Sequence, residues 1–202
     1  MDAEILTALA LFACVASITP GPNNMMLMSS GLTFGWRLTL PHMLGVAIGF
    51  TVMIFAVGVG LGALFEAMPQ LYLALKVISV AYLLVLAWKI ANSGPIAEGG
   101  RAGSKPMTFL QAAAFQWVNP KAWVMAVTAI AAYAPKQAFF ANVLIVSGVF
   151  GIVNLPCISA WAMFGMVLRR FLHNASLVRI INMGMALALV ASAYPLLAEF
   201  LG

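Results

Sequence analysis

Long apolar stretches recur along this chain, separated by short polar or basic segments. Each apolar stretch is close to, or longer than, the roughly 20 residues that a helix needs to cross a membrane. The pattern therefore predicts an all-α membrane protein in which residues 1–202 form a single transmembrane domain with six transmembrane helices. The expected helices are residues 5–32, 39–65, 70–91, 109–132, 138–167 and 177–201.

Two of these helices are interrupted near their middles. The first contains Thr19-Pro20-Gly21-Pro22-Asn23-Asn24, and the fourth contains Asn119-Pro120-Lys121. A proline inside a membrane helix removes a backbone donor and frees carbonyl groups, which hydrocarbon cannot satisfy. Broken helices at matching places in the two halves of a chain are typical of transporters, whose substrate site lies between the breaks near the bilayer midplane.

The segment 92–106 divides the chain into three helices plus three. It is rich in glycine, proline and charge, which is typical of a solvated loop. With an odd number of helices in each half, the second half enters the membrane in the opposite direction. The sequence therefore favours a 3+3 inverted repeat in which helices 1 and 4 are the broken pair.

Composition agrees with a membrane protein, because 64% of residues are hydrophobic, 7% are charged and the mean hydropathy is +1.04. A soluble domain would carry about a quarter charged residues. Basic residues concentrate around the connections after helices 1, 3 and 5, namely Arg37, Lys89, Arg101, Lys105, Arg169, Arg170 and Arg179. The positive-inside rule places these connections in the cytoplasm and both termini on the outer side. The net charge of +5 then reflects contact with the lipid bilayer, and no stripe of basic and aromatic residues indicates a nucleic-acid partner.

The two breaks suggest a binding site for a zwitterion. Asn119 is a preferred N-cap residue and Pro120 fits the first helical position, while Gly21-Pro22-Asn23 can start a helix in the same way. Two helix N-termini would present N–H donors to a carboxylate, and the carbonyls that end the preceding half-helices would suit an ammonium group. A small amino acid is the expected substrate. The candidate binding residues are Thr19, Pro20, Gly21, Pro22, Asn23, Asn24, Gln116, Asn119, Pro120 and Lys121.

Three ionisable side chains lie inside the predicted helices and allow more than one interpretation. Lys121 is some ten residues inside its helix, where a lysine costs about 2.5 to 3.5 kcal/mol and marks a pathway or a paired site, unless it snorkels toward one face. Lys76 is nearer its helix end and is expected to snorkel. His42 follows Pro41 in the first turns of the second helix. It could take up a proton, but a hydrogen-bonded interfacial histidine is the favoured interpretation.

Other small residues are interpreted structurally. Gly31 and Gly35, followed by Gly45 and Gly49, recur four apart and are expected to let helices pack closely. Cys14 and Cys157 show no CxxC spacing and are expected to be small buried hydrophobes. The sequence shows no enzyme motif, metal-ligand set or cofactor-binding motif, so we expect neither a cofactor nor a metal.

The motifs resemble the LysE/RhtB family of amino-acid exporters. The resemblance covers nearly the whole chain and rests on Thr19-Pro20-Gly21-Pro22-Asn23, the four glycines above, Ala81-Tyr82-Leu83 with Trp88, and Val118-Asn119-Pro120-Lys121-Ala122. It implies a multi-pass protein of the bacterial cytoplasmic (inner) membrane that exports small amino acids or their derivatives as a secondary transporter, by proton antiport. Asn23-Asn24 and Trp88-Lys89-Ile90-Ala91 look most like the cysteine and O-acetylserine exporter branch.

One departure from that family concerns the proton. Some relatives carry an acidic residue inside the membrane, whereas here Asn23 and Asn24 are neutral and Glu66 and Glu199 lie at helix ends. Two other functions stay open. A membrane thiol-disulfide conductor can share a six-helix plan, although it needs a cysteine beside each break, and a non-transporting assembly subunit would have little use for a polar, broken midplane. The sequence leaves the oligomeric state open, a homo-oligomer included.

Overall fold

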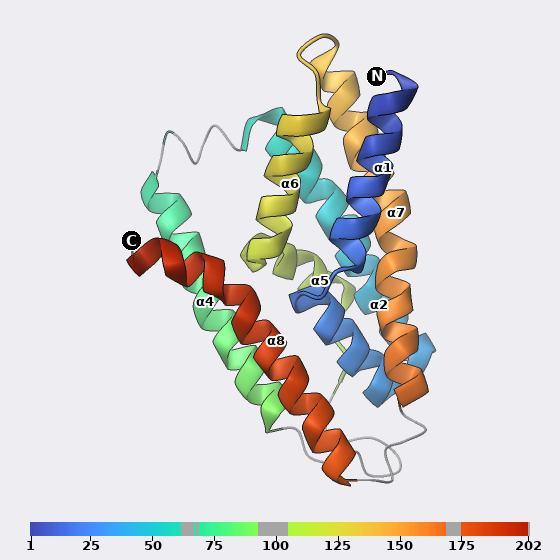
Figure 1. The fold of residues 1–202 in the computed structure, drawn as a ribbon, viewed down its shortest axis with the longest axis vertical. Coiled ribbons are helices and arrows are strands. Elements are labelled where there is room, and N and C mark those ends of the chain that lie inside the picture. The colour runs from blue at the N-terminus through green and yellow to red at the C-terminus, as the bar shows by residue number, and fades with distance from the viewer. Residues whose placement is uncertain (62–66, 68, 93–104, 169–174, 202) are drawn as a thin grey trace.

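The computed structural model describes residues 1–61, 67, 69–92, 105–168 and 175–201, and all regular elements within these ranges are helices (Figure 1). This confirms the predicted all-α class. The elements are α1 Ala3–Ile18, α2 Pro22–Ala56, the π-helical turn η1 Val57–Leu61, α4 Pro69–Ala91, α5 Phe109–Phe115, the 3-10 turn η2 Gln116–Val118, α6 Pro120–Tyr133, α7 Phe139–Leu168 and α8 Ala175–Leu201.

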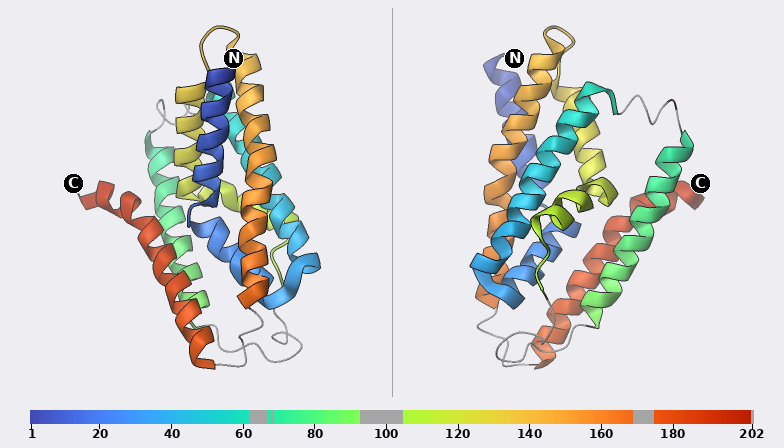
Figure 2. Two further views of the ribbon diagram at one scale, coloured as in Figure 1. Left: turned by 45° about the vertical axis from the view of Figure 1, so that its right-hand side comes forward. Right: turned by 180° about the vertical axis from the view of Figure 1, so that it is seen from behind.

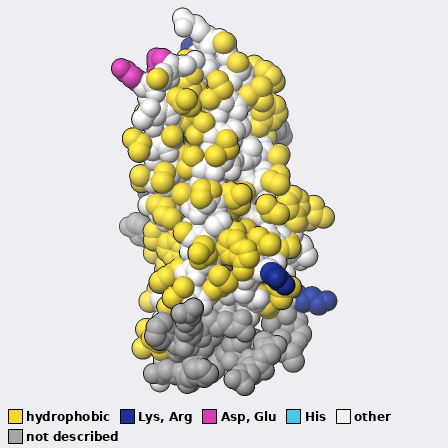
Figure 3. Space-filling view, turned by 90° about the vertical axis from the view of Figure 1, so that its right-hand side faces the viewer, with side chains coloured by type: hydrophobic (Ala, Val, Ile, Leu, Met, Phe, Trp, Pro, Cys, Tyr) yellow, Lys and Arg dark blue, Asp and Glu magenta, His cyan; other side chains and the backbone are white. Residues whose placement is uncertain are grey.

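The surface of the bundle is apolar over most of its length. In Figure 3 hydrophobic side chains cover the visible face, acidic side chains lie near one end and most of the basic side chains toward the other. Within the described residues, Pro22–Gly60 and Phe139–Leu168 form helical stretches long and apolar enough to cross a membrane. Large apolar side chains on these helices are exposed, such as Val52, Ile152 and Phe164. A surface of this kind is suited to lipid.

The first predicted break is present between α1 and α2. Asp2 caps the start of α1 by accepting a hydrogen bond from the Ile5 N–H, and the helix ends at Thr19, whose backbone is extended. Pro22 is the first residue of α2 and Gly21 is its N-cap residue. The φ angle of Gly21 is 179°, which is ordinary extended backbone. The chain therefore leaves the helix for only a few residues before it continues.

A second feature of α2 differs from the prediction. The sequence suggests one helix ending at residue 32 and another starting at 39, but the helix continues between them with a single non-helical residue, Gly35, at φ 75° and ψ −178°. Only glycine readily adopts this conformation. Figure 2 shows α2 descending from the first break and then rising again. Gly35 therefore turns the chain, and its expected role in helix packing stays a prediction.

The second predicted break separates α5 from α6. Thr108 and Gln111 form a capping box at the start of α5, which orders a short helix. After the turn η2, Asn119 has an extended backbone and its side-chain oxygen accepts a hydrogen bond from the Lys121 N–H, with Pro120 as the first residue of α6. Asparagine and proline thus occupy the positions that the sequence analysis gives them.

Glycines bring the backbones of neighbouring helices together. A methyl group at Gly31 would overlap the carbonyl group of Ala162 in α7, and one at Gly45 would overlap the carbonyl group of Phe109 in α5. At Gly49 it would lie 2.6 Å from the Cα atom of Ala113. These three glycines therefore do pack helices closely, as predicted, and they place α2 against both α5 and α7.

The helices α4 and α8 lie side by side at the flank of this bundle (Figure 2). Their buried residues Leu83, Ala87 and Met185 pack with Met25 and Phe115, which follow the first break and precede the second. The predicted loop 92–106 lies mostly outside the described residues, as do residue 65, where the second predicted helix was to end, and the Lys76 side chain.

Candidate functional site

The two breaks meet in space, and Lys121 connects them. From the first turn of α6, its Nζ donates hydrogen bonds to the Thr19 carbonyl oxygen at 2.7 Å, the Thr19 Oγ1 at 2.9 Å and the Pro20 carbonyl oxygen at 3.2 Å. A cation is stabilised at a helix C-terminus, where the last carbonyl groups carry partial negative charge. Lys121 therefore supplies both hydrogen bonds and charge to the end of α1.

Gly21 leaves room for this lysine. A methyl group built on Gly21 would lie 2.7 Å from Lys121 Cδ and 3.2 Å from its Nζ. The backbone of Gly21 is extended and needs no glycine for conformational reasons. A side chain at this position would instead displace the lysine stem from the end of α1.

An amide pair forms a second connection between the breaks. Asn23 Nδ2 donates to Gln116 Oε1 at 2.8 Å, and Gln116 Nε2 donates back to Asn23 Oδ1 at 3.1 Å. Gln116 is 0% exposed and also donates to the Ala112 carbonyl oxygen at 2.9 Å. This reciprocal pair fixes the start of α2 against the end of α5.

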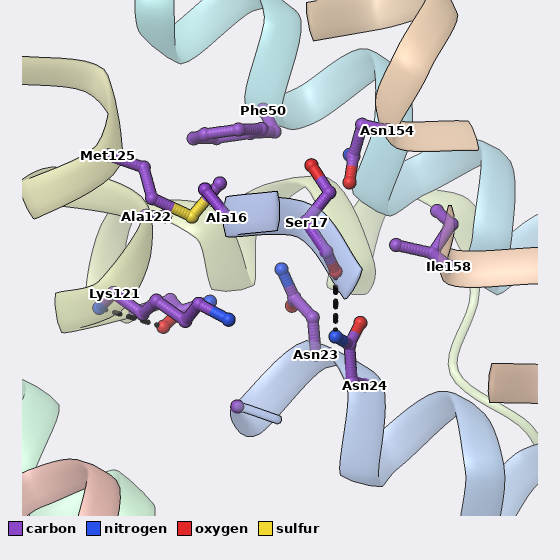
Figure 4. A pocket seen from close by; sticks show the side chains of 12 residues that line it. Ala16, Ser17, Asn23, Asn24, Phe50, Lys121, Ala122, Met125, Asn154 and Ile158 are labelled. Atoms are coloured by element: carbon purple, nitrogen blue, oxygen red, sulfur yellow. Dashed lines mark hydrogen bonds between the residues drawn. The ribbon is translucent and has the colours of Figure 1, made fainter. Parts of the chain in front are cut away.

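Asn24 occupies more of the carbonyl groups that end α1. Its Nδ2 donates to the carbonyl oxygens of Ser17 and Thr19, both at 2.8 Å (Figure 4). The sequence suggests that the carbonyl groups at the end of α1 bind a substrate ammonium group. In this conformation they instead accept hydrogen bonds from Asn24 and Lys121. The carbonyl groups of Gln116 and Trp117 likewise accept hydrogen bonds from the Asn119 N–H and the Trp123 Nε1.

The two helix starts differ in how their N–H groups are used. At α6, the Asn119 side chain accepts the Lys121 N–H and the Asn119 carbonyl accepts the next two N–H groups. At α2, the N-cap residue is Gly21, so no side chain caps the helix. Of the two starts, that of α2 is better suited to an anion, because its first donors have no capping side chain.

A small polar pocket lies between the breaks (Figure 4). Its volume is about 20 Å³, which is room for about one water molecule. Five of the ten candidate residues line it, namely Gly21, Asn23, Asn24, Asn119 and Lys121. The other five support it: the Thr19 and Pro20 carbonyls bind Lys121, Gln116 bonds to Asn23, and Pro22 and Pro120 begin the two helices.

Sequence reasoning missed the side of the pocket formed by other helices. Phe50 of α2 and Asn154 and Ile158 of α7 line it, as does Met125 of α6. The one available signal was Asn154, a polar residue two positions before Pro156 in an apolar helix. Ser17 also faces the pocket, and its Oγ is buried without a hydrogen-bond partner in the described structure.

His42 departs from its expected environment. It is 2% exposed, and neither of its ring nitrogens has a hydrogen-bond partner in the described structure. The interpretation as a hydrogen-bonded interfacial histidine is therefore wrong. It lies on α2 about two turns before Phe50, which lines the pocket.

The two cysteines are neighbours across α1 and α7. Cys157 Sγ lies 3.8 Å from the Cys14 carbonyl oxygen. Cys157 is buried, but Cys14 is exposed, so the expectation of two buried residues is wrong for Cys14. Both are free thiols, and neither lies in a break. The described residues contain no group of three or more His, Cys, Asp or Glu that could hold a metal ion.

An apolar helical bundle in which two broken helices meet at a pocket with polar lining residues is typical of membrane transporters. Comparison with known proteins identifies the class more narrowly. The chain belongs to the LysE type translocator family, whose model matches residues 14–199. This family membership agrees with the motifs at both breaks.

Characterised relatives share nearly the full length of the chain. The cysteine/O-acetylserine efflux protein of Salmonella typhimurium is 30% identical over 195 residues, which cover 96% of this chain and 97% of the relative. The cysteine/O-acetylserine efflux protein of Escherichia coli K12 is 30% identical over 198 residues, with the same coverage. No solved structure gives a significant match.

Proposed function

We propose that this protein is a secondary transporter that exports small amino acids or their derivatives across the bacterial cytoplasmic membrane by proton antiport, with cysteine and O-acetylserine as the first substrates to test. The observation that carries the proposal is the meeting of the two broken helices at Lys121, which contacts the end of one half-helix from the start of another. The named relatives support the substrate class.

The site suits both ends of a zwitterion. A substrate carboxylate would lie between the Lys121 ammonium and the uncapped start of α2, where charge and N–H donors favour an anion. A substrate ammonium would replace Lys121 Nζ at the carbonyl oxygens of Thr19 and Pro20. In the absence of substrate Lys121 thus holds the place of the ammonium group, and on binding it turns toward the carboxylate.

The observed pocket has no room for an amino-acid substrate. A volume of about 20 Å³ is too small for an amino acid. The Asn23–Gln116 pair and the Lys121 hydrogen bonds both cross between the breaks, so admission of substrate requires these contacts to separate. Alternating access would then consist of opening one side of this junction at a time.

We further propose that the whole chain is one domain with six transmembrane segments in a 3+3 inverted arrangement. The segments would be α1 with the first part of α2, the rest of α2, α4, α5 with α6, α7, and α8. The arrangement of basic residues supports this. In Figure 1 the N-terminus lies beside the connection between α6 and α7, while the bend of α2, the segment that leads into α5 and the start of α8 lie toward the opposite end. Arg37, Lys105 and Arg179 are near that opposite end, which we assign to the cytoplasm.

Counterflow in proteoliposomes would test the substrate class. The purified full chain is reconstituted with a high internal concentration of one unlabelled amino acid, and uptake of the same labelled compound is followed. The panel is cysteine kept reduced, O-acetylserine, threonine, homoserine and lysine. We expect exchange of cysteine or O-acetylserine and little exchange of lysine, whose second ammonium group would lie next to Lys121.

Two comparisons decide the outcome of that assay. Liposomes with Lys121→Met protein, matched for protein content, should exchange much more slowly than those with the parent. A parent protein that exchanges no member of the panel would refute amino-acid export and favour the assembly-subunit alternative. Restoration of growth in a host inhibited by the same amino acid would show export in cells.

A further inference from the structure

His42 is a buried ionisable residue that the proposed substrate site does not use. It lies on α2, is 2% exposed, and has two ring nitrogens without a hydrogen-bond partner in the described structure. Buried polar groups in native proteins are nearly always bonded, because an unpaired one loses its hydration without compensation. A buried imidazole without a hydrogen bond lowers the stability of the fold, so close packing alone does not explain its presence here.

The position of His42 places it at a helix contact that must be able to move. Gly45 and Gly49 follow it at spacings of three and seven, so all three share one face of α2. Those glycines fit against Phe109 and Ala113 of α5, the half-helix that leads to the second break. One turn before His42, Thr39 shares a hydrogen bond of 2.9 Å with Ser30. His42 therefore lies where α2 meets the lower half of a broken helix.

Within the described part of the chain, the helices α2, α5, α6 and α7 contain no carboxylate that could pair with His42. On α2 the nearest charged residue is Arg37. The helix α5 has no charged residue, although Lys105 precedes it. In α7 the thiol of Cys157 is the one titratable group. The charged residues on the other helices that contact α2 are Glu4 at the start of α1, Lys121, Arg179 at the start of α8 and Glu199 at its end. Inside α2, α5, α6 and α7, the ionisable groups besides Cys157 are Arg37, His42, Lys121 and Tyr133. Lys121 is bonded to α1, and His42 has no hydrogen-bond partner in the described structure.

We propose that His42 binds and releases the proton that drives export, and that it does so as the contact between α2 and α5 opens and closes. A protonated imidazole without a partner is costly in apolar surroundings but not in water. Protonation would therefore favour a conformation in which α2 and α5 separate and water reaches the ring, and loss of the proton would favour the closed packing observed here. Two conformations that differ in proton affinity are what coupling to a gradient requires. This inference rests on the proposed export function and names its coupling residue.

The test separates exchange from coupling in the same proteoliposomes. Counterflow at equal pH on both sides measures substrate exchange, which needs no net proton movement. Uptake into liposomes with a more acidic lumen measures coupling, and a gradient of one pH unit should support about tenfold accumulation for one-to-one antiport. We expect His42→Asn protein to keep the counterflow rate of the parent with labelled cysteine or O-acetylserine and to lose accumulation under the gradient.

A second variant and a control test whether the loss of gradient-driven accumulation reflects damage to the fold. His42→Leu removes the unpaired nitrogens and should melt at the same temperature as the parent or above it, while also losing gradient-driven accumulation. The chain has one other histidine, His173, and His173→Asn should behave as the parent in both assays.

The results discriminate between the two proposals. Gradient-driven accumulation by both His42 variants at the level of the parent would overturn the inference, and so would a joint loss of counterflow and melting temperature, which would make His42 structural. Counterflow without any gradient response in the parent would remove proton coupling but leave amino-acid export intact. Absence of counterflow in the parent across the panel would refute the export function itself.

Discussion

Lys121 shows how a single charge can be kept inside an apolar bundle. Its ammonium group donates to the Thr19 and Pro20 carbonyl oxygens, and these belong to the end of a helix that attracts a cation. The lysine does not snorkel to a helix end, because its stem lies over Gly21 in the other break. The charge is therefore held by the break and remains available to an anionic ligand.

Replacing Lys121 by methionine tests whether this charge serves transport. Lys121→Met nearly preserves side-chain volume and removes a cation that is costly to insert, so the protein should reach the membrane at normal or higher levels. Hydrogen bonds to charged groups contribute roughly 1.5 to 3 kcal/mol, so export should fall by about tenfold or more. Export rates are compared at equal membrane abundance, with Lys76→Met as the control that should transport nearly as well as the parent. Equal activity of the parent and Lys121→Met would make Lys121 structural.

Gly21 offers an independent perturbation of the same contact. Gly21→Ala introduces no backbone strain, because φ is 179°, but its methyl group would lie 2.7 Å from Lys121 Cδ. We expect slower counterflow with little change in melting temperature. Gly148→Ala in α7 is the matched control, since nothing lies within 4 Å of a methyl group there; it should retain full activity and gain up to about 1 kcal/mol of helix stability. Similar activity of the two variants would show that the lysine position tolerates displacement.

At the scale of elements, the breaks in the helices were predictable and their partners were not. Proline, asparagine and glycine at residues 19–24 and 119–121 determine the local backbone, so the sequence alone indicates where the helices stop and restart. The Asn23–Gln116 pair joins residues 93 apart in the chain, and no local pattern encodes that contact. Gly35 was missed for a different reason, because a single residue with positive φ turns the chain where a loop of several residues was expected.

The amide pair predicts a coupling between the two broken helices. Asn23→Ala would leave the amide of the buried Gln116 without one of its partners, which should cost about 1 to 3 kcal/mol of stability and loosen the junction. The double variant Asn23→Gln with Gln116→Asn preserves both amides and should recover part of the lost melting temperature. Melting of the purified protein in detergent measures both effects. If the double variant instead loses as much melting temperature as the two single changes added together, the two amides do not act as a pair.

The contact between α1 and α7 can be tested through the two native cysteines. Because Cys157 Sγ lies 3.8 Å from the carbonyl oxygen of Cys14, mild oxidation with copper phenanthroline should form an intramolecular disulfide that changes migration on a non-reducing gel. The variants Cys14→Ser and Cys157→Ser should each abolish the change. Failure of the parent to form this disulfide in membranes would contradict the packing of α1 on α7 described here.

At the scale of the whole molecule, most of the visible basic side chains lie away from the acidic end. In Figure 3 the acidic side chains lie near one end of the face and most of the basic side chains toward the other, with an apolar surface between them. The sequence leads to a proposed orientation because the positive-inside rule needs only the positions of Lys and Arg. It does not predict that α4 and α8 form a pair beside the remaining helices, since apolar residues occur all round both helices and no periodicity selects a partner.

The orientation leads to a labelling experiment on the intact chain. In a background with Cys14→Ser and Cys157→Ser, a Gly100→Cys variant places a thiol in the basic segment 92–106, and a Gly202→Cys variant places one at the C-terminus. If the basic connections face the cytoplasm, an impermeant thiol reagent added to whole cells should label the cysteine at 202 and not the one at 100, and permeabilised cells should label both. The reverse labelling pattern would show that the protein has the opposite orientation in the membrane. It would leave the pocket and the inverted arrangement unchanged, but it would place His42 on the outer side of the junction, so that proton binding there would accompany opening to the outside.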